Sequence, residues 1–124
     1  MGRVYLHKEL THKIIGFSFE IFNKLGYGLP EKTYQKALEA KLVEDGIRFQ
    51  REKYGKIRLD NVMVGRYFAD FIIEEKLVVE LKVRNEIYQG HIVQLVNYLK
   101  SENYSTGLLI VFSKDGVKIK RIAN

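Results

Sequence analysis

The sequence predicts an α/β fold in which a central mixed β-sheet is flanked by helices on both faces. Apolar residues recur at helical spacing in the first third of the chain and again in residues 87–100. The segments between and after these helices alternate or are continuously apolar, as strands of a covered sheet are. The chain has 124 residues, 46% of them hydrophobic and 29% charged. This suits one folded domain spanning residues 1–124.

Two helices are predicted before the first strand. Thr11 is a suitable N-cap, and Gly26 fits the end of the first helix. The apolar positions between them have helical spacing and are Ile14, Ile15, Phe19, Phe22 and Leu25. Pro30 suits the first position of a second helix, which Gly46 ends.

The rest of the chain is predicted to form the sheet and one further helix. Residues 47–59 alternate, a turn follows at Asp60-Asn61, and residues 64–73 and 77–83 have the pattern of strands buried on both faces. Helical spacing returns in residues 87–100, with an apolar stripe at Ile92, Leu95, Val96 and Leu99. A buried strand at 107–112 and a hairpin through Asp115-Gly116 to residues 117–120 complete the order ααβββαβ(β).

Charged residues interrupt the apolar strands at one place. Glu80 and Lys82 point to the same face of residues 77–83, where they are costly unless paired, hydrated or bound to metal. A three-residue loop at 74–76 would pair Ile73 with Leu77 and set Asp70 opposite Glu80. Two adjacent carboxylates repel, and a divalent cation would offset the repulsion. The pattern indicates a site for a hard cation and a phosphate. The alternative, a buried Glu80–Lys82 pair, leaves Asp70 unexplained.

Four motifs occur in order along almost the whole chain. They are Gly28-x-x-Glu31-x-x-Tyr34 followed by Ala37-Leu38, Asp70 with Glu80-x-Lys82 across a hairpin, Gln94-x-x-x-Tyr98, and the terminal Ile119-Lys120-Arg121-Ile122. Together they resemble the GxxExxY family of the PD-(D/E)XK nuclease superfamily, with the QxxxY motif of its RecB-type branch. This resemblance implies a restriction-endonuclease-like fold.

The resemblance also implies roles for individual residues. Asp70, Glu80 and the backbone carbonyl of Leu81 would ligate Mg²⁺ or Mn²⁺, with Glu31 as an additional acidic residue of the metal site. Lys82 would stabilise charge on the phosphate or position the attacking water. The other residues that the resemblance places at the catalytic site are Gln94 and Tyr98.

Three of these residues have ordinary alternatives. Glu31 lies in the first turn of a helix, where a carboxylate complements the helix dipole. Gln94 and Tyr98, with His91, would form a polar flank about 120° around the helix from its apolar stripe.

Charge and composition indicate the partner and the compartment. The net charge of +6 favours polyanions such as nucleic acid. A basic group interleaved with aromatic and apolar residues is predicted to follow a phosphate backbone, or else to form a charged edge strand that blocks aggregation: Arg48, Arg51, Lys53, Lys56 and Arg58. The absence of cysteine, of a signal peptide and of an apolar run of about 18 residues predicts a cytoplasmic protein without a membrane span.

The expected function is metal-dependent hydrolysis of phosphodiester bonds in DNA. A homodimer is expected, because a lone module of this size usually needs a partner or a second copy to grip a duplex. Two alternatives stay open: a nucleic-acid-binding module on the same fold with weak or lost catalysis, and a protein-interaction scaffold.

Overall fold

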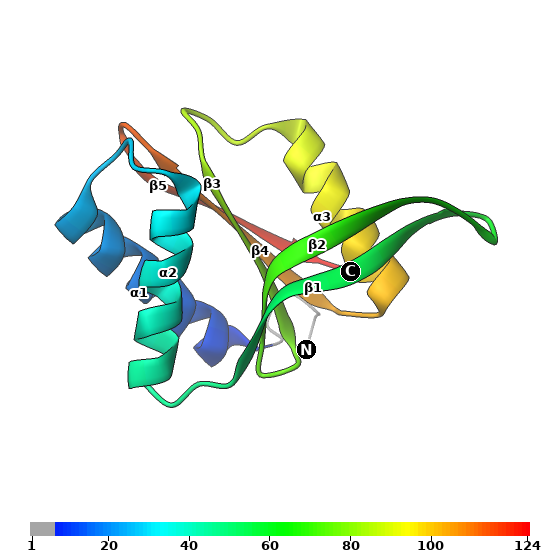
Figure 1. The fold of residues 1–124 in the computed structure, drawn as a ribbon, viewed down its shortest axis with the longest axis horizontal. Helices are drawn as coiled ribbons and strands as arrows, with labels where there is room; N and C mark the ends of the chain where they lie inside the picture. Colours follow the sequence, from blue (N-terminus) through cyan, green and yellow to red (C-terminus); the bar gives the residue numbers. More distant parts are fainter. Residues whose placement is uncertain (1–6) are drawn as a thin grey trace.

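The computed structural model describes residues 7–124, which form a five-stranded sheet in the order β1-β2-β3-β4-β5 with three helices (Figure 1). The elements in chain order are α1 (Lys8–Leu25), α2 (Glu31–Glu44), β1 (Phe49–Leu59), β2 (Val62–Ile73), β3 (Leu77–Val83), α3 (Gln89–Glu102), β4 (Thr106–Ser113) and β5 (Gly116–Ala123). The amino-terminal segment, for which the sequence predicts no signal peptide, lies mostly outside residues 7–124.

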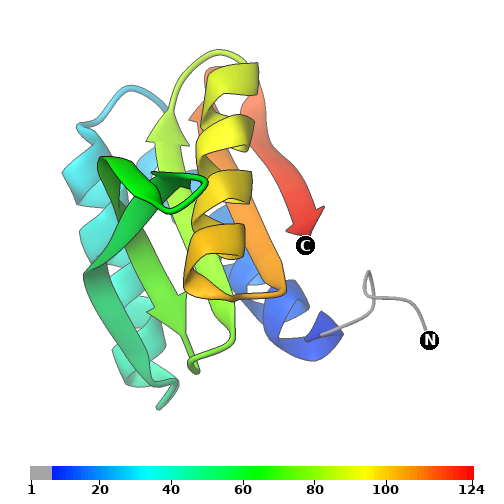
Figure 2. The same cartoon turned by 90° about the vertical axis from the view of Figure 1, so that its right-hand side faces the viewer.

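The sheet is mixed, as predicted. β3 and β4 are parallel and are connected through α3, whereas the other three neighbouring pairs are antiparallel. Turned by 90°, the ribbon shows α3 on one face of the sheet and α1 and α2 behind it (Figure 2). The predicted fold, a restriction-endonuclease-like sheet with helices on both faces, is therefore confirmed.

Each face of the sheet carries its own core. On one face, α1 and α2 cover apolar side chains of the central strands, with the Tyr34 ring stacked on Phe112 at 4.4 Å between centroids. On the other face, α3 packs Leu95, Tyr98 and Leu99 against β2, β3 and β4. Two covered faces explain why β3 and β4 are buried along almost their full length.

The β2–β3 hairpin has the predicted register. Ile73 pairs with Leu77 across a loop at 74–76, and the described pairing ends at Phe71 and Val79. Beyond that point the two strands separate. The separation opens the corner of the sheet that holds the predicted site residues.

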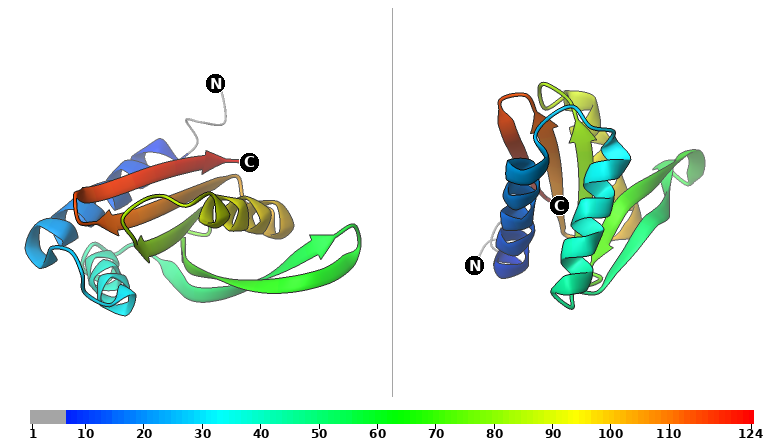
Figure 3. Two further views of the ribbon diagram at one scale, coloured as in Figure 1. Left: turned by 90° about the horizontal axis from the view of Figure 1, so that it is seen from above. Right: turned by 60° about the vertical axis from the view of Figure 1, so that its left-hand side comes forward.

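Beyond this corner β1 and β2 continue alone as a two-stranded ribbon, which we call the arm (residues 53–59 of β1, the turn at 60–61 and residues 62–69 of β2). Seen from above, the arm extends past the other strands (Figure 3). The expectation that residues 64–73 are buried on both faces is wrong for the first half of that segment. Val64 is 59% and Phe68 55% exposed, because the core under α1 and α2 reaches only as far as Phe71 along this strand.

Some predicted boundaries also shift. Thr11 is not an N-cap: α1 begins at Lys8, and the Thr11 hydroxyl donates to the His7 carbonyl at 2.8 Å from inside the helix. Pro30 is the residue before α2 rather than its first residue, and α3 begins at Gln89. Within residues 7–124 no helix is both long and apolar enough to cross a bilayer.

Candidate active site

The site is built where β2 leaves β3. The Asp70 amide donates to Glu80 Oε2 at 2.5 Å, and the Leu81 amide donates to Asp70 Oδ2 at 2.8 Å. Each carboxylate thus accepts a backbone hydrogen bond from the opposite strand, just beyond Phe71 and Val79, where the pairing of β2 with β3 ends. These reciprocal bonds hold Asp70 and Glu80 together, as the register argument requires.

Glu80 has a second partner that the sequence did not reveal. Its side chain is 2% exposed, and its Oε1 accepts a hydrogen bond from the Tyr67 hydroxyl. Burial and the Glu80 charge keep the pKa of Tyr67 well above its ordinary value, so the phenol remains a donor. Tyr67 therefore fixes the Glu80 carboxylate, while the other Glu80 oxygen is held by the Asp70 amide.

The two carboxyl groups are electrostatically strained. Burial raises the pKa of Glu80 to about 8, and the nearby Asp70 charge adds to the rise. Burial also raises the pKa of Asp70 to about 6, although the Leu81 amide and the Lys82 ammonium oppose it. The charged forms of both carboxyl groups are therefore disfavoured in the fold, and a cation bound between them would stabilise these charged forms.

Lys82 and Glu31 border the carboxylate pair. Lys82 lowers the pKa of both Asp70 and Glu80, whereas the Glu31 charge raises that of Asp70. Within residues 7–124, Glu80 and Lys82 form no ion pair, so the alternative of a simple buried pair is not supported. α2 and α3 both begin at the end of the molecule where β3 finishes, so that Glu31 starts a helix beside the corner (Figure 1).

The donor set suits a hard divalent cation. Carboxylate oxygens from Asp70 and Glu80, with the Leu81 carbonyl and water, are ligands that Mg²⁺ and Mn²⁺ prefer. Among the described residues, no three His, Asp or Glu side chains are arranged to hold a metal ion together. Glu31 therefore influences the pair through its charge, and its place as a metal ligand stays a prediction.

The two QxxxY residues occupy different environments. Tyr98 is buried rather than on a polar flank: its hydroxyl donates to the Lys53 carbonyl at 3.2 Å, and its ring centroid lies 5.6 Å from that of Tyr67. Tyr98 thus supports the residue that holds Glu80. Gln94 is exposed on α3, and its catalytic role stays a prediction. His91 is half-buried, and Lys82 contributes to lowering its pKa after burial.

Arg51 belongs to the site rather than to a free basic edge. Its guanidinium donates to the Asp70 carbonyl at 3.1 Å, to Glu39 at 2.7 Å and to Gln35 at 2.9 Å. It also lies over the Phe71 ring, 4.5 Å from the centroid. Arg51 therefore ties α2 to the backbone of Asp70.

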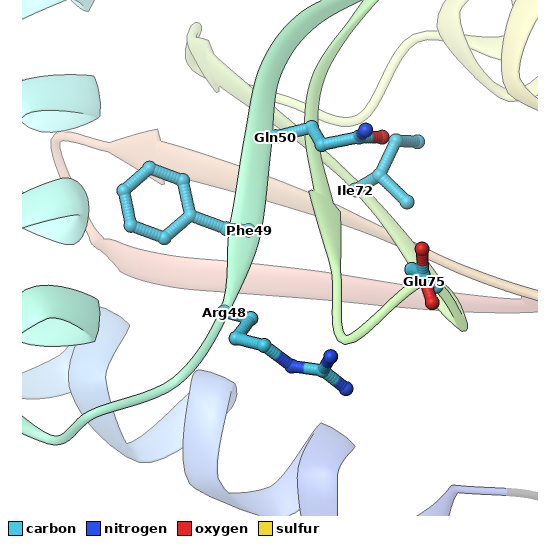
Figure 4. Close-up of a pocket in the computed structure, with 5 residues that line it drawn as sticks. All are labelled: Arg48, Phe49, Gln50, Ile72 and Glu75. Carbon is cyan, nitrogen blue, oxygen red and sulfur yellow. The ribbon is translucent and has the colours of Figure 1, made fainter.

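The remaining predicted basic residues fall into two groups. Arg48 pairs with Glu74 at 3.1 Å, beside a small pocket of about 110 Å³ near the β2–β3 loop (Figure 4). Lys53, Lys56 and Arg58 lie on the arm, and within residues 7–124 their side chains form no ion pairs. These three are the predicted cations that the structure leaves available to a phosphate.

Comparison with known proteins gives a family and a fold. The family model of the PD-(D/E)XK nuclease superfamily matches residues 8–122. The solved structures include that of the protein SSO0001, similar with a TM-score of 0.60 and 20% sequence identity. The match covers 98% of this chain and 61% of SSO0001. No curated protein matches the chain. The superfamily match agrees with the resemblance seen in the motifs, without resolving the GxxExxY family within it.

Proposed function

Since the chain belongs to the PD-(D/E)XK nuclease superfamily, we propose that it hydrolyses phosphodiester bonds in DNA with the help of Mg²⁺ or Mn²⁺. The observation that carries the proposal is the reciprocal bonding of Asp70 and Glu80. It concentrates two carboxylates with raised pKa values beside Lys82, and a scaffold has no need of such a corner.

The site residues would have separate roles in metal binding and in charge stabilisation. Asp70, Glu80 and the Leu81 carbonyl would hold the cation, which would polarise the scissile phosphate and lower the pKa of its bound water. Lys82 would stabilise the charge that develops on the phosphate. Glu31 and Gln94 are proposed to complete the site beside the substrate, and Tyr98 is proposed to support it from within the core.

Three residues position the site without touching the reacting atoms. Tyr67 orients Glu80 through its hydroxyl, and Tyr98 packs behind Tyr67. Arg51 holds the backbone of Asp70 from the side of α2. Because all three contacts act on the metal-binding pair, they would hold its geometry before a substrate arrives.

Cleavage of a panel of labelled substrates tests the proposal. The panel holds duplex, branched and single-stranded DNA and RNA, each incubated with Mg²⁺, Mn²⁺ or EDTA. We expect cleavage of DNA that EDTA abolishes and that Asp70→Asn reduces together with metal affinity. Asn keeps the shape of Asp but removes the anionic ligand. Cleavage unaffected by EDTA or by Asp70→Asn would mean that another site, or a contaminant, is responsible.

A second function has support of its own. Within residues 7–124 the arm residues Lys53, Lys56 and Arg58 form no ion pairs, so the same fold would also serve as a nucleic-acid-binding module with weak or lost catalysis. Binding of Mg²⁺ and DNA without cleavage of any substrate would favour it.

We further propose that the chain acts as a homodimer, because a domain of 124 residues covers little of a duplex. Light scattering during size-exclusion chromatography measures this directly, and a monomer mass with and without DNA would contradict it.

A further inference from the structure

The arm presents one face that no other described element covers. On this outer face Tyr54 pairs with Phe68 and Lys56 with Arg66 across the two strands. The Tyr54 and Phe68 rings meet edge to face with centroids 5.5 Å apart, and both remain exposed, at 39% and 55%. An exposed aromatic pair flanked by cations offers apolar contact to base edges and positive charge to phosphates.

The opposite face of the arm is already occupied. Tyr98 packs so tightly on Gly55 that an added Cβ there would lie 2.3 Å from its ring. Ser101 donates to the Lys56 carbonyl, and Glu102 accepts from the Lys56 amide at 3.1 Å. These contacts from α3 hold this part of the arm against the helix and block strand addition along part of β1.

The net positive charge of the arm favours an anionic partner. It carries four basic side chains, Lys53, Lys56, Arg58 and Arg66, and one acidic side chain, Asp60. Among residues 7–124 none of these five forms an ion pair. Two copies of this face would bring like charges together, so a second copy of the chain is disfavoured as the occupant.

The cations also stand on both strands of the ribbon, with Lys56 and Arg58 on β1 and Arg66 on β2. Paired strands lie about 4.8 Å apart. The major groove of a duplex, which is about 12 Å wide, admits a two-stranded ribbon. Cations on both strands are then placed to reach the phosphates on both walls of the groove.

A pocket of about 230 Å³ lies between the arm and α3, on the side of the arm opposite the outer face. It is lined by Ile57, Arg58, Asn97, Lys100 and Ser101, with two cations and no acid among its lining residues. The pocket lies near the turn of the arm, and its cations add to the positive potential that attracts a polyanion.

We propose that the arm lies in the major groove of a DNA duplex and delivers that duplex to the Asp70–Glu80 corner. Asp70 follows Phe68 by two residues on β2, so the base of the arm and the site are continuous. The inference rests on the proposed function for its substrate. It adds that the substrate is double-stranded, and it names a basic residue outside the predicted group, Arg66.

Fluorescence anisotropy tests the proposal. A labelled duplex and a labelled single strand of the same sequence are titrated with full-length protein in the Asp70→Asn background, which suppresses cleavage. The arm variant is Lys56→Gln/Arg58→Gln/Arg66→Gln. The control, Lys24→Gln/Lys114→Gln/Lys120→Gln, removes the same charge from exposed positions away from the arm. Thermal melting and size-exclusion chromatography establish that both variants are folded.

For the arm variant we expect duplex affinity to fall about tenfold or more. The log–log salt slope should decrease by roughly 2–3, since each phosphate contact contributes about 0.9. Single-strand affinity should fall less, and the control variant should stay within about threefold of the parent. Tyr54→Ser/Phe68→Ser should weaken duplex binding with an unchanged salt slope, because it removes apolar contact alone.

Three outcomes would overturn the proposal. Equal losses for the arm and control variants would mean that the arm makes no special contact. Equal losses for duplex and single strand would exclude insertion into a groove. Conversion of a dimer to a monomer by the arm variant would make the outer face a contact between copies. The nuclease proposal fails separately, if the wild-type protein cleaves no substrate; the binding result for the arm would still stand.

Discussion

The hydrogen bond from Tyr67 to Glu80 gives a prediction that separates positioning from packing. Tyr67→Phe removes one hydroxyl and leaves Glu80 Oε1 buried without its donor, because Glu80 is 2% exposed and water cannot replace the bond. A hydrogen bond to a charged group contributes about 1.5–3 kcal/mol. We therefore expect the free energy of unfolding to fall by about 2 kcal/mol where Glu80 is ionised.

The effect should depend on pH. The Tyr67 bond favours the charged form of Glu80, whose pKa in the fold is about 8. Tyr67→Phe is therefore expected to lower the free energy of unfolding by the full amount at pH 9 and by less at pH 5, where Glu80 is protonated. Urea unfolding of the metal-free protein at pH 5 and pH 9 measures this loss of stability. Tyr54→Phe is the matched control, since that hydroxyl only approaches Met63 Sδ at 3.7 Å on the exposed arm.

A double-mutant cycle with Glu80→Gln assigns the loss to the bond. We expect a coupling energy between positions 67 and 80 of about 1 kcal/mol or more at pH 9. A loss for Tyr67→Phe that is the same at pH 5 and pH 9 would refute the reasoning, as would a coupling energy near zero. Either result would mean that Tyr67 contributes by packing on Tyr98 alone.

Three further predictions concern packing, protonation and the link to α2. Gly55→Ala should cost about 1–3 kcal/mol because its Cβ would overlap the Tyr98 ring, whereas Gly65→Ala, with 3.5 Å to its nearest neighbour, should cost less in the same denaturation assay. Because Asp70 and Glu80 have raised pKa values in the fold, the unfolded chain binds fewer protons between about pH 4 and pH 8. Metal-free stability should therefore fall as pH rises through that range, and Mg²⁺ should restore more stability at pH 8 than at pH 5; a flat profile would contradict this. Arg51→Lys should lower Mg²⁺ affinity measured by calorimetry, since an ammonium cannot reproduce the bonds to Asp70, Glu39 and Gln35, and unchanged affinity would exclude a positioning role.

The sequence predicted the sheet and the central pair of carboxylates because both follow from local rules. Helical spacing and apolar strands fixed the order of elements. The cost of a carboxylate in an apolar strand selected the loop at 74–76, and that loop set Asp70 beside Glu80. The structure confirms this register through the pairing of Ile73 with Leu77.

Tyr67 escaped prediction because strand alternation fails at Asp70. In a regular strand Tyr67 and Asp70 point to opposite faces. Here Ala69 packs in the core under α3 and Phe71 in the core under α1 and α2. The side chains of β2 therefore switch faces between Ala69 and Phe71, next to Glu52 of β1, which has a φ of 49°. No periodicity in the sequence marks this change.

The arm and Arg51 depended on contacts that are distant in sequence. Val64, Tyr67 and Phe68 continue the apolar run that predicts a buried strand, but the core under α1 and α2 ends at Phe71 and leaves Val64 and Phe68 exposed. Arg51 was indistinguishable from the other basic residues of β1 until Glu39 and Gln35 of α2 were placed beside it. Tyr98 is buried because β1 curves over α3, which a helical wheel cannot anticipate.

The most direct test of the central claim is single-turnover cleavage of duplex DNA with Mg²⁺ by the wild-type protein and by Lys82→Ala purified in parallel. Lys82 acts on the phosphate rather than on the cation, so Mg²⁺ affinity should be largely retained while the cleavage rate falls about 10²-fold or more. Equal cleavage rates for the two proteins would contradict the assignment of phosphodiester hydrolysis to the corner formed by Asp70, Glu80 and Lys82.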